Sequence, residues 1–317
     1  MGVSHALREI RRNWSDRTWW RKRFLTHVVA RYYDFRPHDA TPVTEREWDT
    51  LLVLDACRHD LFRELFDDRP LPGVLDSRTA VETGTPGFLA ETFGDRTFHD
   101  IVYVTGNPYV STDLDAEQFH AVDEVWRDGW DDELGTVHPK TMRDRTLAAA
   151  ENYPEKRIIS HFLQPHAPFV GETRLPGDRE TFAVRERALG DSDATRSVRT
   201  PFERLEAGEL TRDEVWRAYR SNLEFAFPAV RDLLEELDGL TAVTSDHGNA
   251  LGERALPFPI RVYGHPLGVL IPALTEVPWL THQNGERREV VAEPPERREQ
   301  EVADETAARL RQLGYAE

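Results

Sequence analysis

Short apolar runs separated by helical patterns are the feature that most constrains the fold of this chain. Residues 51–54 and 101–104 are apolar throughout, as expected of strands that are buried on both faces of a sheet, and residues 157–163 are predicted to form a third strand. Apolar residues at helical spacing occupy residues 61–66 and, over a long stretch, residues 214–237. This alternation predicts an α/β fold: a single domain whose mostly parallel central sheet has helices on both faces.

The remaining elements follow from turn and capping residues. Thr85 is expected to cap a helix that Pro86 opens and that continues to Phe93. We expect further strands at 240–244 and 268–271, a polar surface excursion over 172–200 and a last helix over 301–313.

The composition indicates the kind of environment in which the protein is found. Only three of the 40 basic residues are lysines, and the net charge is −17, a pattern typical of halophilic proteins that stay soluble in concentrated salt; a GC-rich genome would also favour arginine. The single cysteine, Cys57, excludes an intramolecular disulfide and is expected to be a small buried side chain. Because no run approaches the length of a membrane span and no secretory signal is recognisable, a cytoplasmic location is expected.

The N-terminal residues form a segment of their own, so we divide the chain into a basic arm, 1–40, and a domain, 41–317. Residues 1–36 carry nine basic and three acidic residues, a charge of +6 that leaves −23 on the remainder. Aromatic and aliphatic residues are interleaved with these charges. Such a helix packs its apolar stripe on its own protein in most cases, and the alternative is peripheral contact of residues 1–36 with an anionic membrane surface. The acidic remainder repels phosphate backbones, so we expect no nucleic-acid partner.

Acidic and imidazole side chains follow several predicted strands. In an open α/β sheet the carboxyl ends of the strands meet at one edge, where ligands bind. The residues concerned are Asp55, His161, His166, Asp246, His247 and, in the next loop, His265. Each of these residues taken alone has a structural explanation, as a turn residue, a helix cap or a histidine of the core. The adjacent Asp246-His247 pair, followed by Gly248, favours a shared divalent cation such as zinc or manganese.

These motifs together resemble the alkaline phosphatase superfamily, which includes sulfatases and lipoteichoic-acid-synthase-like enzymes. TSDHG followed by LGE is similar to its metal-binding signature, and LLVLDACRHD is similar to its opening strand. QPHAPF and GHPLG are similar to segments that place histidines, here His166 and His265, near the transferred group. The resemblance covers residues 47–317 and implies an alkaline phosphatase-like fold. It also implies a metal-dependent hydrolase or transferase for phosphate or sulfate esters, with Zn, Mn or Ca as cofactor.

The resemblance further implies a hydroxyl nucleophile at the start of a helix, and here both Thr83 and Thr85 qualify by position. Because Thr85 is already assigned as a cap, we predict Thr83 as nucleophile and as a metal ligand beside Asp55, Asp246 and His247. Arg58, His166 and His265 are expected to surround the substrate, and one of the two histidines to protonate the leaving group. The absence of a C-x-P-x-R motif disfavours a formylglycine sulfatase.

The substrate and the reaction remain open at this stage. A lipid-linked or nucleotide-linked sugar is compatible with the resemblance. A non-catalytic sulfatase-like scaffold, held at a membrane surface by the basic arm, is the alternative function.

Overall fold

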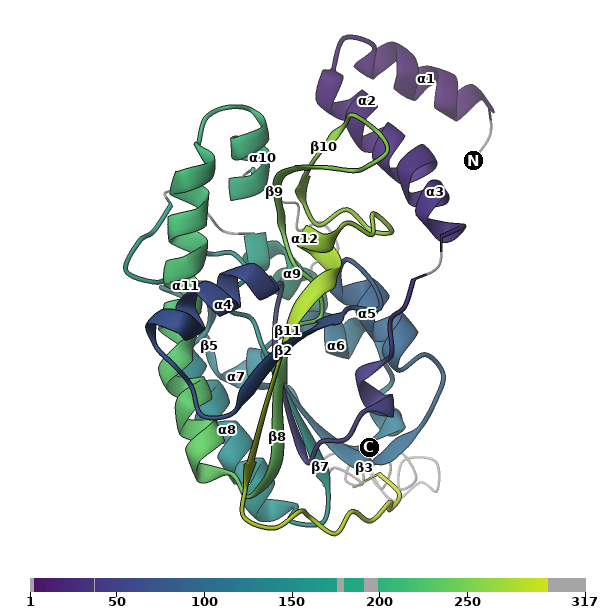
Figure 1. Cartoon of the computed structure of the whole chain (residues 1–317). Coiled ribbons are helices and arrows are strands. Elements are labelled where there is room, and N and C mark those ends of the chain that lie inside the picture. The colour runs from purple at the N-terminus through teal and green to yellow at the C-terminus, as the bar shows by residue number, and fades with distance from the viewer. Residues whose placement is uncertain (1–2, 37, 176–179, 191–198, 296–317) are drawn as a thin grey trace, which may run out of the picture.

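A seven-stranded sheet is the centre of the part of the chain that the computed structural model describes, residues 3–36, 38–175, 180–190 and 199–295. The strand order is β2-β11-β8-β1-β7-β3-β4. The strands are β1 (Thr50–Leu54), β2 (Val74–Thr79), β3 (Phe98–Thr105), β4 (Phe119–Asp123), β7 (Arg157–Phe162), β8 (Gly239–Thr244) and β11 (Glu276–Asn284). Of these, β11 pairs antiparallel with both its neighbours, whereas the other pairs are parallel. The predicted, mostly parallel α/β fold is confirmed (Figure 1).

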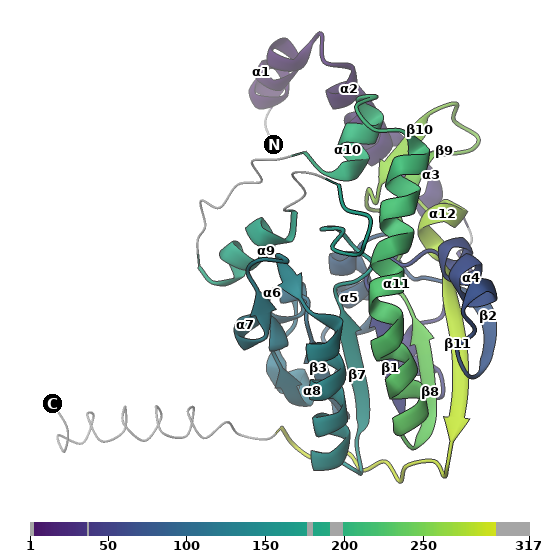
Figure 2. The ribbon, with the colours of Figure 1, turned by 90° about the vertical axis from the view of Figure 1, so that its left-hand side faces the viewer.

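Helices cover the sheet on both faces, because alternate residues of the buried strands enter two different cores. Leu52 and Leu54 lie in a core with α4 (His59–Asp68), α8 (Pro139–Asn152) and α11 (Arg212–Glu236). Leu51 and Val53 lie in the other core. That second core includes Phe88 and Leu89 of α5 (Thr85–Thr92) and Val110 of α6 (Pro108–Asp113). Figure 1 shows these layers edge-on, and Figure 2 shows the sheet face-on, with its strands side by side behind α8 and α11.

The N-terminal arm lies at the end of the molecule to which the parallel strands point (Figures 1 and 2). It comprises α1 (Val3–Asn13), α2 (Arg17–Phe24), a π-helical turn (Leu25–Val29) and α3 (Ala30–Asp34). Leu25 and Val29 are buried in a small core. The other members of this core come from the hairpin of β9 (Ala250–Arg254) and β10 (Arg261–Gly264) and from the segment that follows it. The expectation that the arm packs on its own protein is therefore confirmed for this stripe.

The smaller elements connect these parts. They are η2 (Val43–Glu45), η3 (Ala116–Gln118), α7 (Val125–Asp128), β5 (Trp130–Asp131), β6 (Thr136–Val137), α9 (Glu180–Ala188), α10 (Pro201–Glu206) and α12 (Pro272–Thr275). No helix within the described ranges combines the length and the apolar composition that crossing a bilayer requires.

Two sequence expectations differ from the structure, and a third segment gains a helix within its expected surface course. Residues 268–271 are not a strand, because Val269 and Ile271 pack in the core beneath the arm, and the strand that follows is β11. Thr85 does not cap α5; Gly84 does, and Thr85 is the first helical residue. The excursion over 172–200 contains a helix, α9. The helix predicted over 301–313 lies outside the described residues.

Candidate active site

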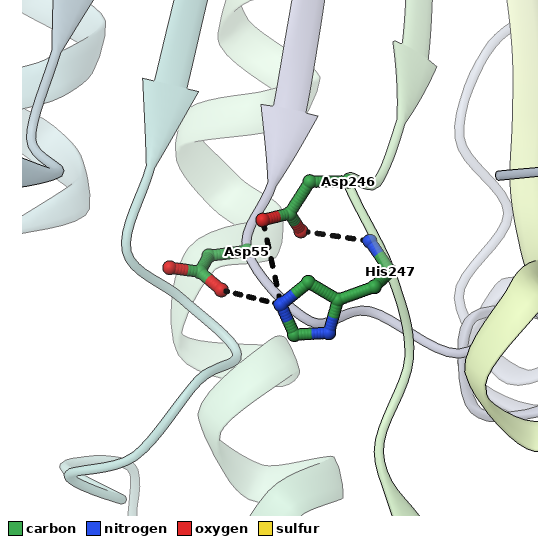
Figure 3. Close-up of side chains that lie close together, drawn as sticks. All are labelled: Asp55, Asp246 and His247. Carbon is green, nitrogen blue, oxygen red and sulfur yellow. Dashed lines mark hydrogen bonds and ion pairs between the residues drawn. The ribbon is translucent and has the colours of Figure 1, made fainter. Parts of the chain in front are cut away.

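Asp55, Asp246 and His247 converge at the carboxyl end of the sheet (Figure 3). They follow the neighbouring parallel strands β1 and β8, so the register of these strands brings their ends together. His247 Nε2 lies 3.8 Å from Asp55 Oδ1 and 3.5 Å from Asp246 Oδ2. All three side chains are buried, and their nearest nitrogen and oxygen atoms lie within 4.8 Å of one another. The structure thus brings together three of the four predicted metal ligands.

The backbone after β1 adopts a conformation that orients this cluster. Ala56 has a φ of 58° and is the one non-glycine residue with a positive φ in the described ranges. In this left-handed conformation, which costs an alanine about 1 kcal/mol, its amide donates to Asp246 Oδ1 at 2.9 Å. The amide of His247 donates to the same oxygen at 2.9 Å. Oδ1 is therefore held by backbone donors, and Oδ2 is the oxygen that faces His247.

Two buried imidazoles direct a nitrogen toward the carboxylates. His247 Nδ1 lies 2.8 Å from the carbonyl of Gly248 and is therefore the protonated nitrogen, which leaves a lone pair on Nε2. His161 Nδ1 lies 3.0 Å from the Tyr103 hydroxyl, and its Nε2 lies 3.9 Å from Asp246 Oδ2. Within the described residues neither Nε2 has a hydrogen-bond partner. Burial lowers the pKa of both rings, to about 4 for His161, so both are neutral at pH 7.

The donor set fits a divalent cation. Two buried carboxylates beside neutral imidazoles need a positive partner, because a buried carboxylate without one is strongly destabilising. Ligand atoms around a tetrahedral zinc ion lie roughly 3.3 Å apart, and the distances here are slightly longer. Oxygen and imidazole nitrogen donors are those that zinc and manganese accept.

Thr85, and not the predicted Thr83, directs its hydroxyl at the cluster. Thr85 Oγ1 donates to Asp246 Oδ2 at 2.7 Å. Thr83 is fully buried, and its Oγ1 lies 2.9 Å from the carbonyl oxygen of Pro266 and 3.1 Å from Glu82 Oε1. Since Gly84 caps α5, the hydroxyl of Thr85 has no capping role.

A cavity of about 220 Å³ opens beside these residues. Its polar lining includes Asp55, Thr85, His166 and His265. His166 Nε2 and His265 Nε2 are 3.4 Å apart, and the rings of His265 and His247 are stacked at a tilt with centroids 4.6 Å apart. Burial, with the neighbouring histidines, lowers the pKa of His265 well below its usual value. The structure therefore brings both predicted histidines to the cluster.

Arg58 does not line this cavity; its guanidinium is held inside the protein. It donates to Asp60 at 2.8 and 2.6 Å, to Glu253 at 2.8 Å and to the carbonyl of Asn249 at 2.9 Å. Burial lowers the pKa of Arg58, but its bonds to the two carboxylates outweigh burial and raise the pKa above the ordinary value. Arg58 thus ties the loop after β1 to the β9 strand, and its expected place beside the substrate stays a prediction.

Asn107 belongs to the site and was not predicted. Its Nδ2 donates to Asp55 Oδ2 at 2.8 Å, and its Oδ1 accepts from the amide of Tyr109 as the N-cap of α6. Asn107 also lines the cavity. The signal in the sequence is an Asn-Pro pair directly after a strand, which predicts a helix cap but no contact with Asp55.

Comparison with known proteins finds similarity only among solved structures: no family model and no curated protein matches this sequence. The soluble domain of lipooligosaccharide phosphoethanolamine transferase A from Neisseria meningitidis matches with 13% identity and a TM-score of 0.45, over 74% of this chain and 75% of that domain. The periplasmic domain of a Campylobacter jejuni phosphoethanolamine transferase matches with 16% identity and a TM-score of 0.44, over 73% and 77%. An alkaline phosphatase superfamily protein from Vibrio parahaemolyticus matches with 12% identity and a TM-score of 0.40, over 85% and 70%. At this level of similarity, the activity of the chain has to be argued from its own residues.

Proposed function

We propose that this protein is a metal-dependent enzyme that hydrolyses or transfers a phosphate or sulfate ester, with Thr85 as nucleophile. The observation that carries this proposal is the hydrogen bond from Thr85 to Asp246 at the wall of a cavity that Asp55, His166 and His265 also line. The Thr85 hydroxyl, the candidate metal ligands and the imidazoles of His166 and His265 thus lie around the same cavity.

Asp55, Asp246 and His247 would hold the cation, with zinc, manganese and calcium as candidates. When bound, the cation would supply positive charge beside the transferred group and lower the pKa of a nearby hydroxyl. Thr85 is placed for that effect by its bond to Asp246, and its position at the first residue of α5 adds the positive end of the helix dipole.

Different residues of the cavity have different roles in the proposed reaction. Thr85 Oγ1 forms the bond to phosphorus or sulfur as the bond to the leaving oxygen breaks, and the hydroxyl proton passes to Asp246 Oδ2, which accepts its hydrogen bond. His166 lines the cavity with its Nε2 3.4 Å from that of His265, and we assign protonation of the leaving oxygen to His166. Water or an acceptor alcohol then releases the adduct from Thr85, and the choice of acceptor separates a hydrolase from a transferase.

The lining of the cavity narrows the class of ester. Among the described residues that line it there is no lysine or arginine. Apolar walls are formed by Pro86, Pro108, Leu163, Val184 and Leu267. One cation with no lysine or arginine beside it suits a single negative charge better than two, which favours a phosphodiester or a sulfate monoester over a dianionic phosphate monoester. The apolar walls suit a lipid-linked or other uncharged leaving group.

A substrate panel tests the proposal. Purified protein loaded with Zn²⁺, Mn²⁺ or Ca²⁺ is assayed with p-nitrophenyl phosphate, p-nitrophenyl sulfate and bis(p-nitrophenyl) phosphate. We expect turnover of at least one singly charged ester and its loss in Thr85→Ala. A metal-loaded protein that turns over none of the three esters would contradict the enzyme and support the non-catalytic scaffold.

A further inference from the structure

Exposed apolar side chains are concentrated in the arm. Ten large apolar side chains are exposed in the described part of the chain, and five of them fall within residues 14–35. These five are Trp14, Trp20, Phe24, Val28 and Phe35. Trp14 is 74% exposed and Phe35 is 86% exposed, so neither is covered by the protein itself.

The arm carries two apolar stripes, of which one is buried against the body and the other stays largely exposed. Leu25 and Val29 are four residues apart, are buried, and face the body of the protein. Trp20, Phe24 and Val28 are also spaced by four, one position earlier, and each remains exposed. One residue in a helix turns a side chain by about 100°, so the second, outward stripe lies beside the packed one. The ring of Phe24 packs edge-to-face on Phe258 of the body, with centroids 5.6 Å apart, and Phe24 still remains 38% exposed.

Basic side chains accompany the outward stripe. Arg11, Arg12 and Arg17 are exposed. By contrast, Arg21 pairs with Glu206 and Lys22 with Glu203, and these ion pairs hold the arm against α10. The exposed surface of the arm therefore combines aromatic side chains with arginines, whereas the ion pairs with Glu203 and Glu206 tie the arm to the body.

The position of the arm separates its charge from that of the acidic body. Residues 1–36 carry +6, the remainder carries −23, and the arm lies at one end of the molecule (Figures 1 and 2). At physiological salt, charges further away than about 8 Å are largely screened, so a surface that meets the arm experiences mainly its positive charge. The arm also borders the candidate active site, because Arg21 and His265 line a common cavity of about 310 Å³.

We propose that this outward face, Trp14 to Phe35 with Arg11, Arg12 and Arg17, docks on an anionic lipid bilayer. Tryptophan and phenylalanine enter the interface between headgroups and acyl chains, while arginine binds the lipid phosphates. Nucleic acid would be attracted by the arginines alone and would leave the aliphatic Val28 and the stripe as a whole unused. The docking does not depend on the proposed enzymatic activity.

Vesicle co-sedimentation of the full chain tests this inference. Vesicles of phosphatidylcholine and phosphatidylglycerol, mixed in equal parts, are compared with vesicles of phosphatidylcholine alone. We expect binding to the anionic vesicles, weakening as salt is added. Arg11→Glu/Arg17→Glu should bind roughly tenfold or more weakly, because each basic residue near an anionic surface contributes about a fivefold affinity. Trp14→Ser/Phe35→Ser should weaken binding at every salt concentration.

Matched variants of the body are the controls. Val74→Ser/Leu189→Ser removes two exposed apolar side chains elsewhere, and Arg63→Glu/Arg217→Glu reverses two exposed charges on α4 and α11. Both should bind as the wild type does. The inference is overturned if the wild type does not bind anionic vesicles, or if the body variants lose as much binding as the arm variants. It is also overturned if a DNA duplex binds as tightly and Trp14→Ser/Phe35→Ser leaves vesicle binding unchanged.

Discussion

Thr85 Oγ1 lies 2.7 Å from Asp246 Oδ2, although the two residues are 161 positions apart in the chain. One begins helix α5 and the other follows strand β8. The bond places a hydroxyl against a carboxylate whose second oxygen is fixed by backbone amides of Ala56 and His247. The orientation of Asp246 is therefore built into the backbone, and Thr85 is the side chain that meets it.

Replacement of Thr85 should abolish turnover, whereas replacement of Thr83 should not. Thr85→Ala removes the proposed nucleophile, for which we expect a loss in kcat on the order of 10³-fold or more. Thr85→Ser keeps a hydroxyl and should retain measurable activity. Thr83→Ala removes a hydroxyl that lies near Pro266 and Glu82 and serves as the matched control. Equal losses in Thr83→Ala and Thr85→Ala would contradict this assignment of the nucleophile.

Asn107→Ala should weaken metal binding, because Asn107 holds Asp55 through one carboxylate oxygen. Loss of a residue that orients a metal ligand typically lowers metal affinity by about 10- to 100-fold. Calorimetric titration resolves a difference of this size. Asn107 also caps α6, so a second cap is needed as control. Asp115→Ala removes the N-cap of η3, which should lower stability and leave metal affinity unchanged. An unaltered affinity in Asn107→Ala would show that Asp55 does not depend on this bond.

Arg58→Met should lower stability by about 2–3 kcal/mol at pH 7, because Asp60 loses its cation and Glu253 keeps only that of Arg212, 3.6 Å away. Because the Asp60 side chain is exposed to solvent, the expected loss of stability is smaller than for a fully buried ion pair. Arg145→Met, at a more exposed ion pair, is the control, with an expected loss below about 1 kcal/mol.

The effect of Arg58 should depend on pH. Burial raises the pKa of Asp60 and of Glu253, but Arg58 outweighs it and lowers both below their ordinary values. A depressed pKa in the folded state gives stability that is present above the unfolded pKa, near 4, and is lost as pH falls through the folded value. Urea unfolding should therefore show the difference between wild type and Arg58→Met shrinking from pH 6 to pH 3. A difference that is constant over this range would contradict the ion-pair account.

The strands of the fold were predictable where both faces are buried. Residues 51–54 and 101–104 are apolar throughout, and they belong to β1 and β3, which have a neighbouring strand on each side. Strand β11 was not predicted, because its second half, from Thr281 to Asn284, is polar and partly exposed. Residues 268–271 have the composition of a strand but are buried beneath the arm, a contact that no local pattern reveals.

The cluster of Asp55, Asp246 and His247 was predictable, because parallel strands bring their carboxyl ends to one edge. The choice between Thr83 and Thr85 was not, since both precede or begin the same helix and only the tertiary structure decides which hydroxyl meets Asp246. Arg58 is bound by Asp60, two residues away, and also by Glu253, which is 195 residues away and completes the network. Contacts between distant segments thus decided the roles that local patterns left open.

The metal content of the wild type and of Asp246→Asn is the most direct test of the central claim that this cluster holds a cation. The substitution keeps the shape of the side chain and an oxygen for the amide of Ala56, but removes the negative charge. Elemental analysis after dialysis should find close to one divalent ion per wild-type chain and almost none in Asp246→Asn, with both proteins folded by circular dichroism. Equal metal content in the two proteins, or none in either after exposure to Zn²⁺, Mn²⁺ and Ca²⁺, would contradict the claim.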